Sequence, residues 1–214
     1  MKIDNDNIRK LADDIVLSIT ESFYANGVFN DDDIKDSESH FKALKRILDE
    51  GGIDNLSMTV DHTDSLTSKA RHYKKNNELD YARIFYATYF EHQVNDLIDL
   101  YCRRNKIDNK NRLSIIQSVN IWGKFTWLLE LMNYPKFNKN HLNTIKNLAD
   151  SRNAFVHYKW KEDPDFHSDI NLEAEQKKIE DEFKRIENAV KYFRNYCSKI
   201  KFNGKKNHLK KLIK

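Results

Sequence analysis

Apolar residues recur three or four positions apart along most of this chain, which is the spacing of amphipathic helices. The clearest example runs from about residue 80 to 104, and its stripe consists of Tyr86, Ala87, Phe90, Val94, Leu97, Ile98 and Tyr101. A second long helix is predicted from about residue 171 to 202, with a stripe of Leu172, Ile179, Phe183, Ile186, Val190, Phe193, Cys197 and Ile200. Two such stripes predict a helical bundle.

Three more helices follow from the same periodicity. The first starts at Asp4 or Asp6 and ends before Gly27, with an apolar face of Ile8, Leu11, Ile15, Ile19 and Phe23. The next covers about residues 34–50, offers Phe41, Leu44 and Leu48, and stops at two glycines. Another covers about residues 113–132, lined by Ile115, Val119, Trp122, Phe125, Leu129 and Met132.

The helical pattern is lost between residues 53 and 67, where a loop, a short strand or a mobile segment all fit. This segment is the best boundary between an N-terminal helical extension, residues 1–75, and a main bundle, residues 76–204. Asp61, His62 and Asp64 could be read as metal ligands, but no second cluster completes a coordination shell, so we expect none. Residues 205–214 form a basic tail, either frayed or in contact with RNA phosphates or an acidic partner.

Composition supports an all-α fold for the 214 residues, because five glycines and two prolines leave little turn chemistry. Charged residues make up 33% of the chain, but their signs are mixed and the net charge is only +4. That balance excludes a protein that coats nucleic acid by bulk charge. Only Cys102 and Cys197 are present, and no apolar run reaches the about 20 residues of a membrane span, so we expect a cytoplasmic protein.

The segment SRNAFVHYKW, residues 151–160, ends a helical run that begins near residue 141. At about 100° per residue an apolar stripe forms there, made of Leu142, Ile145, Leu148, Ala149 and Val156. Arg152 falls near the middle of this stripe, where an unpaired guanidinium would cost several kcal/mol. We therefore predict that a carboxylate or a ligand phosphate meets it. Asn153 and His157 are one helical turn apart, and Asp150 lies on the same side.

The Arg-Asn-x-x-x-His pattern of Arg152, Asn153 and His157, placed late in an all-helical chain, resembles the signature of the HEPN superfamily. The best-known members of that superfamily are ribonucleases that use no metal. An earlier helix carries Glu91, much as in HEPN proteins, and the resemblance spans about residues 78–200. It implies a HEPN-like helical bundle and pairs Glu91, at the edge of its stripe, with Arg152.

The resemblance also implies a mechanism without metal or cofactor. His157 moves protons near neutral pH, Arg152 neutralises the charge that builds on the phosphate, and Asn153 fixes the imidazole or the phosphate. The ribose 2′-hydroxyl is the nucleophile, and the products are a 2′,3′-cyclic phosphate and a 5′-hydroxyl. One histidine cannot easily act as both base and acid, so the resemblance implies a homodimer with a composite cleft. The family context adds a toxin or antiphage effector, with an antitoxin or regulatory protein as partner.

Further side chains are candidates for the site or the substrate. Glu91 and Asp150 are expected to support the motif residues. Lys124 is predicted on the solvated face of its helix, with an RNA phosphate as the alternative contact. Tyr158 points away from the core stripe and can stack an unpaired base, and Lys159 beside it is a second candidate RNA contact.

Two other functional classes remain open at this point. The first is a catalytically silent HEPN-like module that dimerises or binds nucleotides or proteins, with Arg152 and Glu91 as a structural ion pair. The second is an unrelated helical adaptor in which the motif occurs by chance. Intact Arg, Asn and His favour the enzyme, whereas a motif buried away from any cleft would favour the module.

Overall fold

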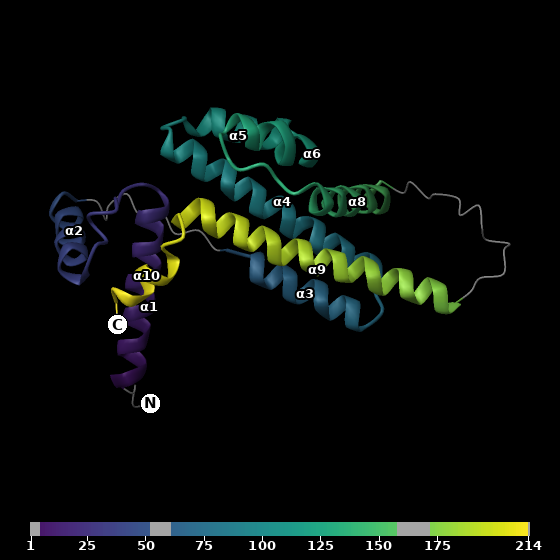
Figure 1. The fold of residues 1–214 in the computed structure, drawn as a ribbon, viewed down its shortest axis with the longest axis horizontal. Helices are drawn as coiled ribbons and strands as arrows, with labels where there is room; N and C mark the ends of the chain where they lie inside the picture. The colour runs from purple at the N-terminus through teal and green to yellow at the C-terminus, as the bar shows by residue number, and fades with distance from the viewer. Residues whose placement is uncertain (1–4, 52–60, 158–171, 214) are drawn as a thin grey trace. The chain divides into compact units, whose positions relative to one another are not determined.

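A computed structural model describes residues 5–51, 61–157 and 172–213, and every regular element in these ranges is helical (Figure 1). The all-α fold predicted from the sequence is therefore confirmed. The helices are α1 (Asn5–Ala25), α2 (Ser37–Asp49), α3 (Thr63–Lys75), α4 (Leu79–Arg104), α5 (Asn109–Ser118), α6 (Ile121–Gly123), η1 (Lys124–Leu128), α7 (Leu129–Leu131), α8 (Lys139–Val156), α9 (Leu172–Phe202) and α10 (Lys206–Lys211). Within the described ranges no helix is long and apolar enough to cross a bilayer.

The chain divides into two compact units, and α4 and α9 contribute residues to both. Unit 1 consists of residues 1–60, 102–106 and 196–214, and it contains α1, α2 and α10. Leu209 of α10 is fully buried, and the imidazole Nε2 of His208 lies 2.6 Å from the carbonyl oxygen of Ile34. Of the two alternatives for the basic tail, the frayed end is wrong, because the buried Leu209 and the His208 contact hold this short helix in place.

Two apolar faces predicted in unit 1 differ from the structure. In α1 only the C-terminal part of the face is buried, and Leu11 remains 62% exposed. In α2 the buried face consists of His40, Ala43 and Ile47, while Phe41, which we expected inside, is 67% exposed. The physical reason is a buried hydrogen bond of 2.9 Å between the Thr20 hydroxyl and His40 Nε2, which turns the histidine side of α2 inward.

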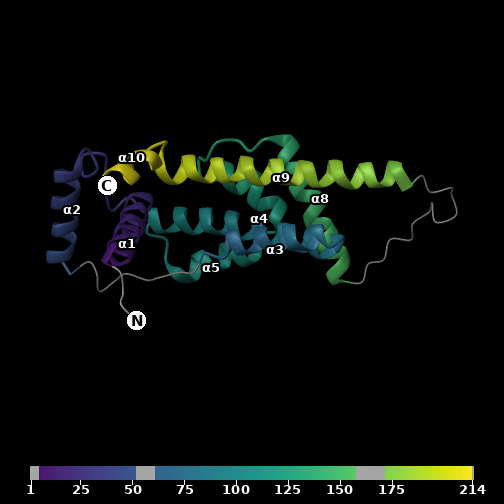
Figure 2. The ribbon, with the colours of Figure 1, turned by 90° about the horizontal axis from the view of Figure 1, so that it is seen from below.

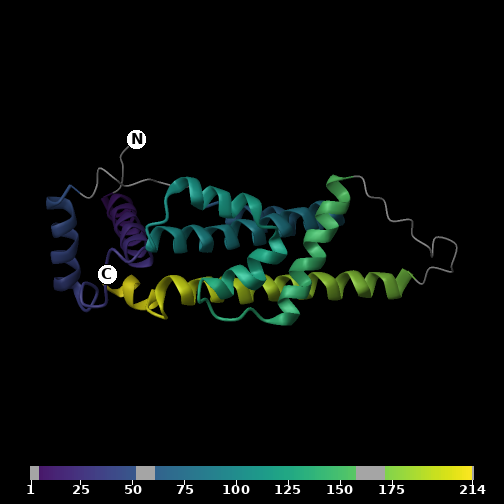
Figure 3. The same ribbon diagram turned by 90° about the horizontal axis from the view of Figure 1, so that it is seen from above.

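Unit 2 consists of residues 61–101 and 107–195, and it contains the motif helix. Helices α3, α4 and α9 run alongside one another, and α8 crosses α9 (Figures 1, 2 and 3). Its centre is aromatic: the rings of Phe90 and Phe193 stack at 6.0 Å, and Phe125 lies 5.0 Å from Phe193. The two long helices predicted from periodicity are present with nearly the predicted bounds.

Helix α3 was not predicted, because the sequence around residues 53–67 lacks a clear apolar stripe. A carboxylate oxygen of Asp61 accepts a 2.8 Å hydrogen bond from the backbone N–H of Thr63, which satisfies a donor at the start of this helix. Asp64 pairs with Arg194 of α9 at 2.6 Å. Asp61 therefore serves the helix start and Asp64 ties α3 to α9, and the described residues contain no cluster of His, Cys, Asp or Glu able to hold a metal ion.

The single helix predicted over residues 113–132 is wrong, because the chain breaks at Val119 and Asn120. The Asn120 side chain accepts a 2.8 Å hydrogen bond from the Gly123 N–H and starts a new helix there. That helix widens into the π-helical turn η1, which begins at Lys124. After the break Phe125, Leu129 and Met132 are buried as predicted, but Lys124 and Leu128 are buried as well, so the inward face extends to the side that the sequence assigned to solvent.

Candidate functional site

The motif residue Arg152 lies on α8 and meets Glu91 of α4. Its Nη1 donates a hydrogen bond to Glu91 Oε2, and the two side chains are 27% and 29% exposed. The pairing predicted from the sequence is thus present in the structure. A half-buried ion pair of this kind links the two helices and fixes the direction of the guanidinium.

Lys124 approaches the other oxygen of the same carboxylate. Its Nζ lies 3.7 Å from Glu91 Oε1, and the lysine is only 2% exposed. The solvated position expected from the sequence is therefore wrong, for the reason given by the helix break. Burial lowers the pKa of the Lys124 ammonium, Glu91 opposes that shift, and the charge of Arg152 adds to it.

We call Glu91, Arg152 and Lys124 the Glu91 cluster. Two cations share one carboxylate, so the cluster carries an excess of one positive charge if all three groups are ionised. The turn that supplies Lys124 is π-helical, a geometry found frequently at functional sites. Positive charge held in a partly dry environment is suited to an anionic ligand.

The other two motif residues lie at the open side of α8. Asn153 is exposed, and its side-chain oxygen accepts a 3.3 Å hydrogen bond from Arg152 Nη2. His157 caps the end of the helix, where its backbone N–H bonds the carbonyl of Asn153 at 3.0 Å, and its side chain is exposed. Asp150 is exposed as well, one turn before Asn153. The structure thus leaves the imidazole accessible while it holds the guanidinium in place.

The end of the motif helix carries exposed apolar surface, although the sequence placed Val156 on the core stripe. Val156 is 57% exposed and Phe155 47% exposed, with the Phe155 ring 5.9 Å from that of Tyr81. The buried stripe of α8 consists only of Ile145, Leu148 and Ala149. Tyr158 and Lys159 lie outside the described residues.

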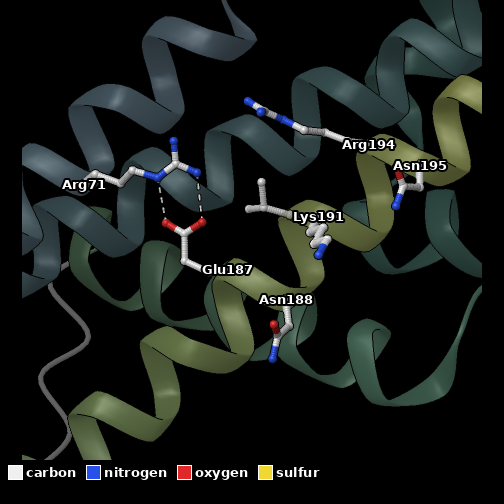
Figure 4. A pocket seen from close by; sticks show the side chains of 7 residues that line it. Arg71, Glu187, Asn188, Lys191, Arg194 and Asn195 are labelled. Carbon is white, nitrogen blue, oxygen red and sulfur yellow. Dashed lines mark hydrogen bonds and ion pairs between the residues drawn. The ribbon is translucent and has the colours of Figure 1, made fainter. Parts of the chain in front are cut away.

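A second charged cluster in the same unit surrounds a shallow pocket of about 410 Å³ between α3 and α9 (Figure 4). Arg71 donates two hydrogen bonds, of 2.8 and 2.9 Å, to Glu187, and the buried Tyr86 hydroxyl donates a third. We call these three residues the Glu187 cluster. Arg71 and then Tyr86 hold the pKa of the Glu187 carboxyl below its usual range.

The charges of the Glu187 cluster balance, because one arginine meets one carboxylate face to face. Arg194, at the other end of the pocket, pairs with Asp64 at 2.6 Å and lies 3.2 Å from the Thr67 hydroxyl. These groups satisfy one another and tie three helices together. We interpret this pocket as a structural seam rather than a reaction centre.

Sequence reasoning found Arg152 and its partner but placed Lys124 on the wrong face. One signal could have corrected it: Asn120 is a good N-cap residue in the middle of the assumed helix. Comparisons with protein-family models, with curated proteins and with solved structures found no match for this chain. The functional interpretation therefore rests on the residues of the site.

Proposed function

We propose that this chain is a metal-independent endoribonuclease of the HEPN type, with Arg152, Asn153 and His157 as its catalytic residues. One observation carries the proposal: the motif arginine is held by Glu91 of a second helix and bonds the exposed Asn153, while His157 at the end of the same helix is exposed as well. Cleavage at a phosphate needs a cation that is held in position and a proton-transfer group that the substrate can reach. The half-buried Arg152 and the exposed His157 are suited to these two roles.

His157 transfers the proton in the proposed reaction. An imidazole can accept a proton at one nitrogen and donate one when it is protonated, so it can activate the ribose 2′-hydroxyl or protonate the leaving 5′-oxygen. Arg152 neutralises the charge that builds on the phosphate, and its planar fork suits two phosphate oxygens at once. The bond from the 2′-oxygen to phosphorus forms as the bond to the 5′-oxygen breaks, which gives a 2′,3′-cyclic phosphate and a 5′-hydroxyl.

Lys124 has a supporting role in this proposal. When an RNA phosphate draws the guanidinium of Arg152 away from Glu91, the buried ammonium remains within 3.7 Å of the carboxylate. Glu91 is then still compensated, so the guanidinium can move without leaving a buried charge unpaired. The excess positive charge of the Glu91 cluster thereby becomes available to the substrate.

The proposed active form is a homodimer, because a single His157 cannot easily serve as base and acid in one step. Two motifs facing each other would supply one histidine for each role. The exposed Val156 and Phe155 at the end of α8 provide apolar surface next to the motif for such a pairing. A toxin or antiphage effector, controlled by an antitoxin or another regulatory protein, is the cellular role that the family resemblance adds.

One observation favours the alternative of a catalytically silent module. Arg152 is already engaged with Glu91, so the pair could serve only to hold α8 against α4. In that case the exposed His157 would have no chemical role. The two functions differ in whether changing His157 affects RNA at all.

The decisive experiment is cleavage of a pool of single-stranded and structured RNA in EDTA by the full chain. We compare the wild type with His157→Ala and with the control His62→Ala, since His62 is exposed and its side chain makes no capping hydrogen bond. We expect chelator-resistant cleavage in the wild type and the control, cyclic-phosphate ends on the fragments, and loss of cleavage in His157→Ala. Equal cleavage by all three proteins would overturn the assignment, and a fully active monomer would contradict the composite cleft.

A further inference from the structure

The exposed side of α8 carries a line of polar residues that leads to the motif. At about 100° per residue, Lys139, Lys146, Asn153 and His157 fall within roughly 40° of one another around the helix axis. All four are exposed. We call them the α8 stripe, and Asp150 lies at its edge.

An exposed tryptophan stands beside this stripe. Trp122 of α6 is 42% exposed, and the ammonium of Lys146 lies 5.2 Å from the centre of its ring. A cation this close to an indole is attracted by the electron-rich face of the ring. The stripe therefore has an exposed aromatic ring at Lys146 and a histidine at its far end.

The next tryptophan shows that the local backbone is shaped around exposed indoles. Trp127 is 53% exposed, and a Cβ added at Gly123 would come within 2.9 Å of its indole nitrogen. The glycine between the two tryptophans therefore leaves room for the second ring to lie against the backbone. Large exposed aromatic side chains held in place in this way are typical of binding surfaces.

We propose that single-stranded RNA binds along the α8 stripe, with one unpaired base stacked on Trp122 and its phosphate paired with Lys146. This inference rests on the proposed function and names the substrate class of the same site. A base that replaces the ammonium on the indole leaves Lys146 free to meet the phosphate. Every base has a face that can stack, so this contact tolerates many sequences.

The length of the stripe sets where the stacked base lies relative to the cleaved bond. Lys146 and His157 are separated along α8 by roughly 16 Å, at about 1.5 Å per residue. Stacked nucleotides in one strand are about 3.4 Å apart and stretched ones are farther apart, so at most about five nucleotides span this distance. Trp122 therefore holds a base a few nucleotides from the scissile phosphate. Asp150 repels phosphate at the edge of the stripe, so the strand passes on the Asn153 side.

The test measures binding of a short fluorescent single-stranded RNA to the full chain, with His157→Ala as the background that prevents cleavage. We compare Trp122→Ala, Trp122→Phe and the control Phe41→Ala, since Phe41 is an aromatic residue of unit 1 that is even more exposed than Trp122, at 67% against 42%. Loss of one stacking contact should weaken binding by roughly five- to a hundredfold in Trp122→Ala. Trp122→Phe keeps an aromatic ring, so its affinity for RNA should fall much less. Phe41→Ala should bind RNA with the affinity of the His157→Ala background.

Two further measurements keep the result interpretable. Lys146→Gln should reduce the slope of log affinity against log salt by about one, because one phosphate contact is lost. A duplex of the same sequence should bind more weakly, without dependence on Trp122. Circular dichroism and thermal unfolding check that each variant is folded, and if Trp122→Ala fails to fold, the comparison of Lys146→Gln with Phe41→Ala decides.

The outcomes separate this inference from the proposed function. If Trp122→Ala and Phe41→Ala bind RNA equally in the His157→Ala background while the wild-type chain cleaves RNA, the inference is overturned and the ribonuclease remains. Duplex binding as strong as single-strand binding also overturns it. A wild-type chain that neither binds nor cleaves RNA overturns both. Binding that depends on Trp122 without any cleavage supports the stripe and contradicts the enzyme.

Discussion

Two carboxylates in the same bundle, Glu91 and Glu187, each join helices by meeting an arginine, yet their surroundings differ. Glu187 receives both arms of Arg71 and the Tyr86 hydroxyl, and its arginine is 48% exposed. Glu91 receives one arm of Arg152 and a nearly buried ammonium from a π-helical turn. The first arrangement balances its charges, whereas the second holds one cation too many.

The difference indicates which cluster is built for stability and which for a ligand. A balanced, bidentate pair attracts an added anion less strongly, because the charge of its guanidinium is already compensated by the carboxylate that it faces. A carboxylate shared by two cations compensates only one of their two charges, and Arg152 Nη2 also reaches the exposed Asn153. Surplus charge on the helix that ends at an exposed histidine is therefore the informative feature of this fold, rather than the presence of an ion pair.

The largest effect that follows from this comparison concerns the two arginines. Arg152→Ala should lower the rate of RNA cleavage by about 10²–10³-fold, the usual cost of removing one group that stabilises transition-state charge. Arg71→Ala should leave cleavage unchanged within about twofold, although it removes a bidentate pair. Cleavage rates in EDTA at saturating and limiting RNA measure both.

Stability provides the control for that pair of variants. Lys124 remains beside Glu91 in Arg152→Ala, so its loss of folding free energy should be modest and its loss of activity cannot be ascribed to unfolding. A drop in cleavage of the same size in both variants would show that the two clusters do not differ in function.

The next effect concerns the carboxylates themselves. Glu91→Gln leaves the buried ammonium and Arg152 facing each other without an anion, and should lower the free energy of unfolding by about 2–3 kcal/mol. Glu187→Gln should cost only about 1–1.5 kcal/mol, because Arg71 is half exposed and water can take over its hydrogen bonds. Urea unfolding of the two variants and the wild type measures the difference, and a larger loss in Glu187→Gln would reverse the ranking.

Sequence periodicity was enough to predict the long helices α4 and α9 and the inward position of Arg152. Each of these predictions follows from apolar residues that recur regularly over several helical turns. One polar residue within such a stripe does not change which side of the helix is predicted to be buried. The need of Arg152 for a partner follows from the cost of an unpaired buried charge, and Glu91 was the carboxylate at the edge of the neighbouring stripe.

The position of Lys124 could not be predicted in the same way, because it depends on where a helix is interrupted. The capping hydrogen bond of Asn120 starts a new helix and a π turn follows, and the buried face there includes Lys124 as well as the predicted Phe125. The inward face of α2 was missed for a related reason, since a hydrogen bond to Thr20, twenty positions earlier, selects His40 over Phe41. Contacts between residues far apart in the sequence do not alter the spacing of apolar residues, so periodicity cannot reveal them.

A smaller effect is expected for Tyr86, the third member of the Glu187 cluster. Tyr86→Phe removes only the hydroxyl that donates to Glu187, and Arg71 continues to satisfy that carboxylate. The expected loss is about 1 kcal/mol of unfolding free energy, with cleavage unchanged. Thermal unfolding beside the EDTA cleavage assay checks both, and a drop in cleavage would link the Glu187 cluster to the chemistry.

The smallest effect near neutral pH belongs to Lys124→Met. Burial lowers the pKa of the Lys124 ammonium below its usual 10.5, so the folded chain releases this proton at a lower pH than the unfolded chain does. Between the lowered pKa and 10.5 the unfolded chain therefore binds more protons, and the free energy of unfolding rises with pH through that window. Methionine has no such proton and lacks this rise.

At about pH 7 the two proteins should differ by less than about 1 kcal/mol, because loss of the contact with Glu91 is offset by relief from burying a charge. Toward pH 10 the free energy of unfolding of the wild type should rise relative to that of Lys124→Met. Urea unfolding at the two pH values gives the difference, in which the other titrating groups largely cancel because both chains carry them. A wild type that instead loses relative stability as the pH rises would show that Glu91, rather than desolvation, dominates at Lys124, and the Glu91 cluster would then be as balanced as its counterpart at Glu187.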